Sequence, residues 1–382
     1  MSGTGRVALL GTVGLALTAG CGLTGGSGDR LDLAAVCPNP LVVQVAERPR
    51  AEDGLWYRLL GADRRVDRAR HQVNGSLVAE GRRTGITLRL RLGSATVRRE
   101  DPASLLYTDR SLTLAQLTTD DQVHQARRFP TLAVLAPYEI SPLAILWDRR
   151  AHPEFNTIVD IGQTDTKVRY NPSRRWMDYL VGSGLLRGGQ VDGGAGGRGP
   201  SPEEFVRSNG QLVQEGYATS EPYLYEKELA GWRRPLEYQL LHDMGYPLYS
   251  HAVAIRSGDR ERLDPCLRRL VPILQRSQVE FVRAPAVTNQ AVTRLAGEYE
   301  PGRTYPPAQA EFAVRQALRL GLVSNGPNAT LGEFDLGRVR RVIDALDPIL
   351  RERDRPTTAR TTPESLATND YVDRAIGLPR TP

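Results

Sequence analysis

Apolar residues along this chain recur in two patterns, one typical of short strands and one typical of amphipathic helices. Nearly continuous apolar runs predict buried strands, and residues 86–92, where apolar and polar side chains alternate, predict a half-exposed strand. Helical spacing follows Asp264-Pro265 and Asp335, and Pro272 predicts a kink in the first of these helices. Buried strands are predicted at 41–45, 112–117, 132–136, 143–147, 168–170, 216–219 and 238–241, with further helices at 55–60, 176–179, 202–209 and 312–320.

This alternation of strands and helices predicts an α/β fold with mainly parallel sheets. One charged stretch, residues 61–85, lacks a clear period and is predicted to be an irregular surface loop. In parallel sheets a ligand binds beyond the carboxyl ends of the strands. The loops that follow the strands are therefore where ligand-binding residues are expected.

The amino-terminal residues have the pattern of an export signal. Arg6 is the only charged side chain before residue 20, and a 13-residue apolar run from Val7 to Ala19 is too short to span a bilayer, which needs about 20 residues. Residues 17–21, Leu-Thr-Ala-Gly-Cys, resemble the bacterial lipobox, in which the cysteine becomes the first mature residue and carries lipid. The alternative is a plain signal peptide with an incidental cysteine. The Gly/Ser-rich stretch that follows, residues 22–28, fits a flexible tether.

The composition does not indicate a nucleic-acid-binding protein, and the export signal also argues against one. The 382 residues carry a net charge of +6, and the only lysines are Lys167 and Lys227, so arginine supplies nearly all of the positive charge. These arginines are spread along the chain among Asp and Glu residues, as on a solvated surface, and no basic patch is apparent. We therefore expect no nucleic-acid partner.

Three cysteines are present. If Cys21 carries lipid, Cys37 and Cys266 remain as a pair, and disulfides persist outside the cytoplasm. We predict a Cys37–Cys266 bridge; the alternative is two buried free thiols.

The sequence contains no motif typical of catalysis. Residues 194–199 match G-x-G-x-x-G, but no suitable strand precedes them and the next helix begins later, at Pro202, so a flexible loop is expected. None of the five histidines has metal-ligand spacing. We expect no enzymatic activity, no metal and no cofactor.

One stretch resembles a known family: Gly216-Tyr217-Ala218-Thr219-Ser220-Glu221-Pro222-Tyr223 is similar to the solute-binding proteins of ABC importers, in the branch for nitrate, sulfonates such as taurine, and thiamine-pyrimidine precursors. The resemblance covers residues ~38–375. Where this family often has Trp-Pro after the first strand, this chain has Glu47-Arg48-Pro49, and Gly93-Ser94-Ala95 replaces a Gly-Gly-rich loop. Further similar segments are Trp147-Asp148, residues 158–162, 177–180 and 321–323, Gly326, and the ending 368–373.

The resemblance implies two α/β lobes of the type II periplasmic-binding-protein fold, joined by two crossover strands with ligand between the lobes. Tyr138–Pro142 would be the first crossing and residues 243–249 the second. The expected organisation is a signal peptide at 1–20, a tether at 21–37, lobe 1 at 38–137 and 246–345, lobe 2 at 138–245, and an extension at 346–382 that packs back on the body.

The candidate ligand-binding residues lie on loops after strands or at the crossings. Glu52, Asp53 and Glu221 could pair with an amino or ring N–H group, while an anion would instead use the helix start at 173–176 with Arg174 or Arg175. Aromatic walls with a few polar groups suit a small ligand. The full set is Glu52, Asp53, Ser94, Thr96, Tyr138, Ser141, Tyr170, Trp176, Glu221, Tyr223 and Asp243.

These features predict a monomeric, lipid-anchored, extracytoplasmic receptor that delivers a small solute, pyrimidine-like or sulfonate-like, to the permease and ATPase of an ABC importer. One alternative is a surface scaffold or sensor with the same fold. Another is an enzyme similar to the thiamine-pyrimidine synthases, but this chain lacks their cysteine cluster and has only two lysines.

Overall fold

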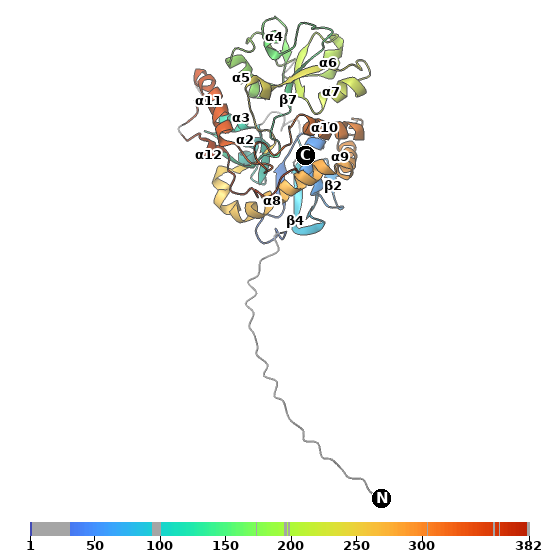
Figure 1. Ribbon diagram of the computed structural model, residues 1–382, viewed down its shortest axis with the longest axis vertical. Helices are drawn as coiled ribbons and strands as arrows, with labels where there is room; N and C mark the ends of the chain where they lie inside the picture. Colours follow the sequence, from blue (N-terminus) through green and yellow to red (C-terminus); the bar gives the residue numbers. More distant parts are fainter. Residues whose placement is uncertain are drawn as a thin grey trace.

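Two separate β-sheets divide the protein into two lobes (Figure 1). The computed structural model describes residue 1 and residues 31–93, 101–172, 174–194, 197, 199–303, 305–353, 356–358 and 360–379. In the first lobe the strands lie in the order β2 (Arg65–Asp67), β3 (Gln72–Ala79), β4 (Arg82–Arg91), β1 (Leu41–Gln44), β5 (Leu114–Leu117), β12 (Ala252–Arg256) and β6 (Thr131–Leu135). In the second the order is β11 (Glu237–Leu240), β7 (Leu143–Trp147), β10 (Val213–Tyr217), β8 (Val168–Arg169) and β9 (Val191–Asp192).

Helices cover both sheets, and the chain crosses between the lobes after β6 and again after β11 (Figure 1). The second lobe carries α4 (Ile158–Gly162), α5 (Trp176–Gly182), α6 (Pro202–Arg207) and α7 (Glu221–Tyr223). The remaining helices are α1 (Gly54–Arg58), α2 (Pro102–Thr108), α3 (Thr119–Gln125), α8 (Arg260–Arg283), α9 (Ala286–Tyr299), α10 (Pro307–Arg319), α11 (Leu336–Glu352) and α12 (Pro363–Leu366).

The two-lobed α/β fold is confirmed, but its sheets are mixed rather than mainly parallel. Among the described strands, four of the ten pairings are parallel. Two features explain three of the six antiparallel pairings, and the other three are β2 with β3 and β7 with both β10 and β11. The hairpin of β3 and β4 adds strands without a crossover helix, and β12 enters the first sheet after the return crossing, antiparallel to both β5 and β6.

The prediction of an irregular loop at 61–85 is wrong, because these residues form β2, β3 and the start of β4. Val73, Leu77 and Ala79 of β3 are buried in the core of the first lobe. Glu80 and Gly81 both have positive φ, at 50° and 74°, as a tight two-residue hairpin turn requires. Buried polar residues of β3, Gln72 and Asn74, interrupt the apolar period and conceal the strand.

Local sequence signals locate some helix ends correctly and one incorrectly. The side chain of Ser201 accepts a hydrogen bond from the Glu204 N–H at the start of α6. At the start of α11, the side chain of Asp335 accepts a hydrogen bond from the Arg338 N–H. Asp264-Pro265 does not open α8, which begins at Arg260 and includes Pro265 and Pro272. Leu263 already lies in the core, so the buried face of α8 begins before Pro265.

The predicted disulfide is confirmed. Cys37 and Cys266 are joined, with an S–S distance of 1.98 Å, and the bridge ties the chain before β1 to α8. The chain before Cys37 is already folded: Leu31 and Leu33 are buried, and the Leu33 N–H donates to the Thr84 carbonyl at 2.9 Å. Residues 31–37, assigned to the tether from sequence, therefore pack on the first lobe.

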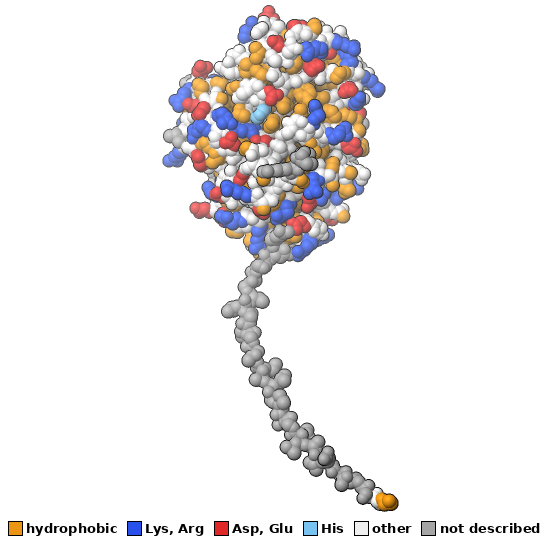
Figure 2. Space-filling view, viewed as in Figure 1, with side chains coloured by type: hydrophobic (Ala, Val, Ile, Leu, Met, Phe, Trp, Pro, Cys, Tyr) orange, Lys and Arg blue, Asp and Glu red, His pale blue; other side chains and the backbone are white. Residues whose placement is uncertain are grey.

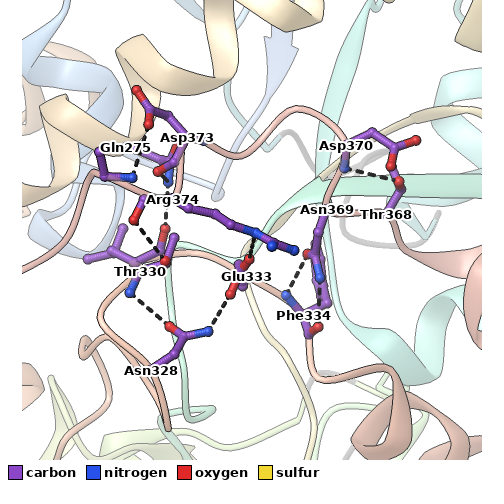
Figure 3. A network of polar contacts seen from close by, with 12 residues as sticks. Gln275, Asn328, Thr330, Glu333, Phe334, Thr368, Asn369, Asp370, Asp373 and Arg374 are labelled. Carbon is purple, nitrogen blue, oxygen red and sulfur yellow. Dashed lines mark hydrogen bonds and ion pairs between the residues drawn. The ribbon is translucent and has the colours of Figure 1, made fainter.

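The carboxyl-terminal segment also packs on the first lobe (Figure 3). Gln275 of α8 exchanges hydrogen bonds with the backbone of Asp373, and Arg374 pairs with Glu333 at 3.0 Å. Asn369 exchanges two further bonds with the backbone of Phe334. The expected domain boundary at 345/346 falls inside α11, which contacts both α3 and α5.

One arginine ties the two crossing segments together. Arg338 of α11 is 5% exposed and donates through Nη1 to Glu139 Oε1 in the first crossing, at 2.9 Å. In the second crossing its Nε donates to the Pro247 carbonyl at 2.7 Å and its Nη2 to the Leu248 carbonyl at 2.8 Å. Its guanidinium also lies 4.0 Å from the ring centroid of Tyr249. The Arg338 side chain thus links the two crossing segments to each other.

Basic and acidic side chains are interspersed over the face drawn in Figure 2. This mixture agrees with the expectation that the arginines are solvated among acidic neighbours. Within the described ranges, no helix is both long and apolar enough to span a bilayer.

Candidate functional site: a charged cavity between the lobes

A cavity of about 320 Å³ lies between the two lobes, and side chains of both line it. From the first lobe come the loop after β1, the end of β5 and the return crossing; from the second come the loop after β8 and the end of β10. The polar residues of the lining include Arg50, Glu52, Gln116, Asn171, Arg174, Tyr217, Glu221, His251 and Tyr305.

The first-lobe wall is built on the short 3-10 helix Ala51–Asp53, which follows β1 and Pro49. All three helix residues are buried; Glu52 is 3% exposed and Asp53 is fully buried. Arg50 lies beside them, with its Nε 3.9 Å from Asp53 Oδ2. Burial raises the pKa of Asp53 to about 6, and the positive charge of Arg50 opposes that rise.

Burial by itself would lower the pKa of Arg50, but the negative charges of Glu52 and Asp53 outweigh burial and raise it. Arg50 is therefore held in a strongly negative environment. Arg50 and Glu52 line the cavity together with Glu47, Arg48, Asp101, Asp121 and Arg303, whereas Asp53 is buried outside the lining.

The second-lobe wall contributes Arg174, which lies before α5, and Glu221, which follows β10. Glu215 of β10 is buried outside the lining and acts on the charge of Arg174. The Asn171 N–H donates to Glu215 Oε1 at 2.8 Å. Burial raises the pKa of Glu215 to about 7 and also raises that of Glu221, which accepts bonds from the Tyr217 N–H and the Ser220 hydroxyl, both at 2.6 Å.

Two contacts join the walls. The hydroxyl of Thr219, which follows β10, donates to Glu52 Oε1 at 2.8 Å. The guanidinium of Arg50 lies 5.1 Å from the ring centroid of Tyr217. Each contact joins a residue of the first lobe to a residue of the second, so the lobes meet at the cavity in the described conformation.

His251 of the return crossing lines the cavity and is 9% exposed. It stacks on Tyr138 of the first crossing, with ring centroids 4.7 Å apart, and its Nδ1 lies 3.2 Å from the Ser250 hydroxyl. Burial, with the charges of Arg50 and Arg174, lowers the pKa of His251 to about 3. His251 is therefore neutral near pH 7.

The structure places some of the predicted ligand-binding residues at the cavity. Glu52 and Glu221 line it, and Asp53 is buried next to Arg50. Ser94 and Thr96 lie outside the described residues, although Gly93, just before them, is in the lining.

The other candidates are not brought into the lining. In the first crossing, Tyr138 and Ser141 are buried, and Ser141 Oγ accepts from the Leu143 N–H at 3.4 Å. Trp176 is in the hydrophobic core at the start of α5, and Tyr170 packs against the same core. Tyr223 packs on Phe312 of α10, with ring centroids 5.6 Å apart, and Asp243 is exposed.

Several lining residues escaped the sequence analysis. Arg174 was considered only for an anionic ligand, and Arg50, Tyr217, His251 and Tyr305 were not singled out. Arg50 had one usable signal: it follows a strand, and the acidic residues Glu52 and Asp53 come two and three positions after it. In a chain with so many arginines that signal does not stand out.

No group of three or more His, Cys, Asp or Glu side chains in the described part of the chain is arranged to hold a metal ion. The cavity instead offers hydrogen-bonding groups, charges of both signs and two tyrosine rings, Tyr217 and Tyr305. Such a lining suits reversible binding of a small polar molecule.

Comparisons with known proteins identify the fold. No protein-family model matches the sequence, and no curated protein matches it. The periplasmic aliphatic sulphonate binding protein SsuA of Escherichia coli aligns with a TM-score of 0.52 at 11% identity, over 90% of this chain and 93% of that one. The alkanesulfonate-binding SsuA of Xanthomonas axonopodis pv. citri, bound to MOPS, aligns with a TM-score of 0.51 at 12% identity, over 84% and 95%.

A third similar structure is the ligand-binding component of an ABC-type import system from Staphylococcus aureus, with a TM-score of 0.52 at 10% identity, over 88% of this chain and all of that one. These similarities show that the chain has the fold of periplasmic binding proteins. More particularly, it is the two-lobed fold used by binding components of ABC importers, as the resemblance in the sequence implied.

Proposed function

We propose that this protein is a lipid-anchored, extracytoplasmic solute-binding protein that delivers a small organic molecule to an ABC importer. The observation that carries the proposal is the interlobe cavity, whose charged side chains come from both lobes and contact one another across it. A ligand that bonds to both walls stabilises the closed arrangement, which is how a two-lobed receptor couples binding to a change of shape. The bound molecule would be held without covalent chemistry.

The body would be held at the outer face of the cytoplasmic membrane by lipid on Cys21, and would meet its permease and ATPase there as a monomer. The resemblance of residues 17–21 to a lipobox supports this location, and the described fold begins at Leu31, ten positions after Cys21. Changing Cys21 to Ser is expected to release the protein from the membrane fraction and to abolish lipid on its amino terminus. Mass spectrometry of the amino-terminal peptide, with Ser27→Ala as control, tests this; membrane retention of the Cys21→Ser variant would contradict it.

Ligand binding is tested by a thermal-shift screen of the purified protein with pyrimidines, organic ammonium compounds, alkanesulfonates and nitrate. A receptor should show a concentration-dependent rise in Tm with at least one solute, since a ligand that binds only the folded state stabilises it. Isothermal titration calorimetry then gives the stoichiometry, expected to be one solute per chain. If no member of the screen raises Tm, the solute-receptor proposal loses its support.

A further inference from the structure

The buried charges of the cavity identify the chemical class of its ligand. We propose that the cavity selects a small organic cation, such as an ammonium or amidinium compound, whose N–H groups bond to Glu52 of one lobe and Glu221 of the other. This inference rests on the proposed solute-binding function and specifies the charge of the solute, which the earlier choice between pyrimidine-like and sulfonate-like solutes left open.

An unsatisfied carboxylate oxygen is the first observation. Glu52 is 3% exposed and lines the cavity; its Oε1 accepts from Thr219, while its Oε2 accepts no hydrogen bond from any described residue. A buried carboxylate oxygen without a donor is costly, and a charged donor satisfies it best. A ligand N–H group in the cavity would supply that donor.

The second observation is the balance of buried charge. The described charged side chains that line the cavity are five carboxylates, Glu47, Glu52, Asp101, Asp121 and Glu221, and four guanidiniums, Arg48, Arg50, Arg174 and Arg303. The pKa of Arg174 is raised despite burial, first by Tyr217 and then by Glu215, Asp121 and Glu47. The lining thus has a small excess of negative charge, which favours a cation over a sulfonate.

The third observation is that like charges meet across the cleft. Glu52 and Glu221 lie on opposite lobes, and Glu52 raises the pKa of Glu221 through repulsion, after the larger effect of burial. Thr219, which bonds to Glu52, is only two residues from Glu221. A cation between these carboxylates would replace repulsion with attraction and so favour closure of the lobes.

The aromatic lining supports the same class of ligand. Arg50 already lies over the face of Tyr217, which shows that a planar cation fits against this ring. Tyr305 lies in the same lining, and its hydroxyl accepts a bond from the Ala51 N–H at 3.0 Å. A cationic ligand with an apolar part would find both a carboxylate pair and tyrosine rings.

Three probes of nearly equal size test the inference by isothermal titration: benzylamine, benzyl alcohol and benzenesulfonate, which are cationic, neutral and anionic. Benzylamine is expected to bind and the other two to bind much more weakly. Glu52→Gln and Glu221→Gln should each weaken benzylamine at least about tenfold, as loss of a charge-assisted bond does. Glu311→Gln, exposed on α10 and absent from the lining, is the matched control and should bind as the wild type does.

The pH dependence gives a readout that needs no variant. Burial raises the pKa of Glu221, so protonation of this carboxylate as the pH falls should weaken benzylamine binding, whereas it would strengthen binding of an anion. Tight binding of benzenesulfonate instead of benzylamine overturns the cation inference and leaves the receptor proposal standing. Absence of binding by all three probes at millimolar concentration also overturns the inference, and the wider solute screen then decides separately on the receptor.

Discussion

The hydroxyl of Thr219 donates a 2.8 Å hydrogen bond to Glu52 Oε1 across the boundary between the lobes. Both residues are buried, at 0% and 3% exposure, so this bond is shielded from water. Glu52 belongs to the short helix after β1, and Thr219 follows β10. A polar link of this kind makes the relative position of the lobes depend on the cavity residues themselves.

Changing Thr219 to Val should loosen the contact between the lobes. The substitution keeps the shape of the side chain but removes the donor to Glu52, which costs about 1–3 kcal/mol when a buried acceptor is left unpaired. Urea denaturation should show this loss, and small-angle X-ray scattering should show a larger radius of gyration.

Thr87→Val, on β4 and away from the cavity, is the control for this prediction. An unchanged radius of gyration and an unchanged midpoint in Thr219→Val would show that the bond does not hold the lobes.

Asp53 should add stability as the pH falls from 7 toward 5, whereas His251, whose folded pKa is about 3, acts in the opposite direction. Burial raises the pKa of Asp53 from 3.8 to about 6, so the folded state binds a proton between these values that the unfolded chain has released. This group stabilises the folded state fully below pH 3.8, its pKa in the unfolded chain, and the stabilisation is lost as the pH rises through about 6, its pKa in the folded state. The full contribution to the free energy of unfolding is ~3 kcal/mol. Glu215, with a pKa of about 7, acts in the same direction.

Asp53→Asn isolates this effect. The variant should have a flatter dependence of the free energy of unfolding on pH, measured by urea denaturation at pH 5 and pH 7. Equal slopes for wild type and variant would contradict the assigned role of Asp53.

Arg338→Met should destabilise the protein by about 3 kcal/mol, because it leaves a partly buried carboxylate and two carbonyl groups without their donor. The carboxylate is that of Glu139 in the first crossing, and the carbonyls belong to the second. Arg341→Met, on the same helix with a side chain 62% exposed, should change stability by less than about 0.5 kcal/mol. Comparable losses in the two variants would argue against a special role for Arg338.

Removing the disulfide should lower stability substantially. Cys37 and Cys266 are 229 residues apart, and a crosslink over a loop of this size is worth about 5 kcal/mol in the chain-entropy model. The Cys37→Ala/Cys266→Ala variant should unfold at a lower urea concentration than the oxidised wild type. A reducing agent should shift the wild type toward the variant and leave the variant unchanged; no shift would show that the bridge adds little.

Much of the architecture was predictable because it is encoded locally. The apolar run at 143–147 forms β7, all but the last residue of the alternation at 86–92 lies in β4, and Ser201 and Asp335 cap the helices that follow them. The cysteine pair was predictable from the count and the export signal. The first strand of the hairpin, β3, was missed, since its buried polar residues Gln72 and Asn74 interrupt the apolar period.

The candidate site was predictable only in part. Glu52 and Glu221 stood out because acidic residues after strands are conspicuous, and both line the cavity. Trp176 and Asp243 looked equally suitable, yet the first is buried in the core and the second is exposed away from the lining. Sequence position tells which residues follow strands, but not which way each loop turns.

By itself the sequence determined the alternation of strands and helices, the pairing of the cysteines and the general class of fold, because these depend on periodicity, on residue type and on a recognisable segment at 216–223. Only the tertiary structure decided which charges share a cavity. Arg50, Arg174 and His251 are separated by long stretches of chain and meet because the chain crosses twice between two sheets. Their electrostatics depends on distance and burial, which exist only after both lobes have packed together.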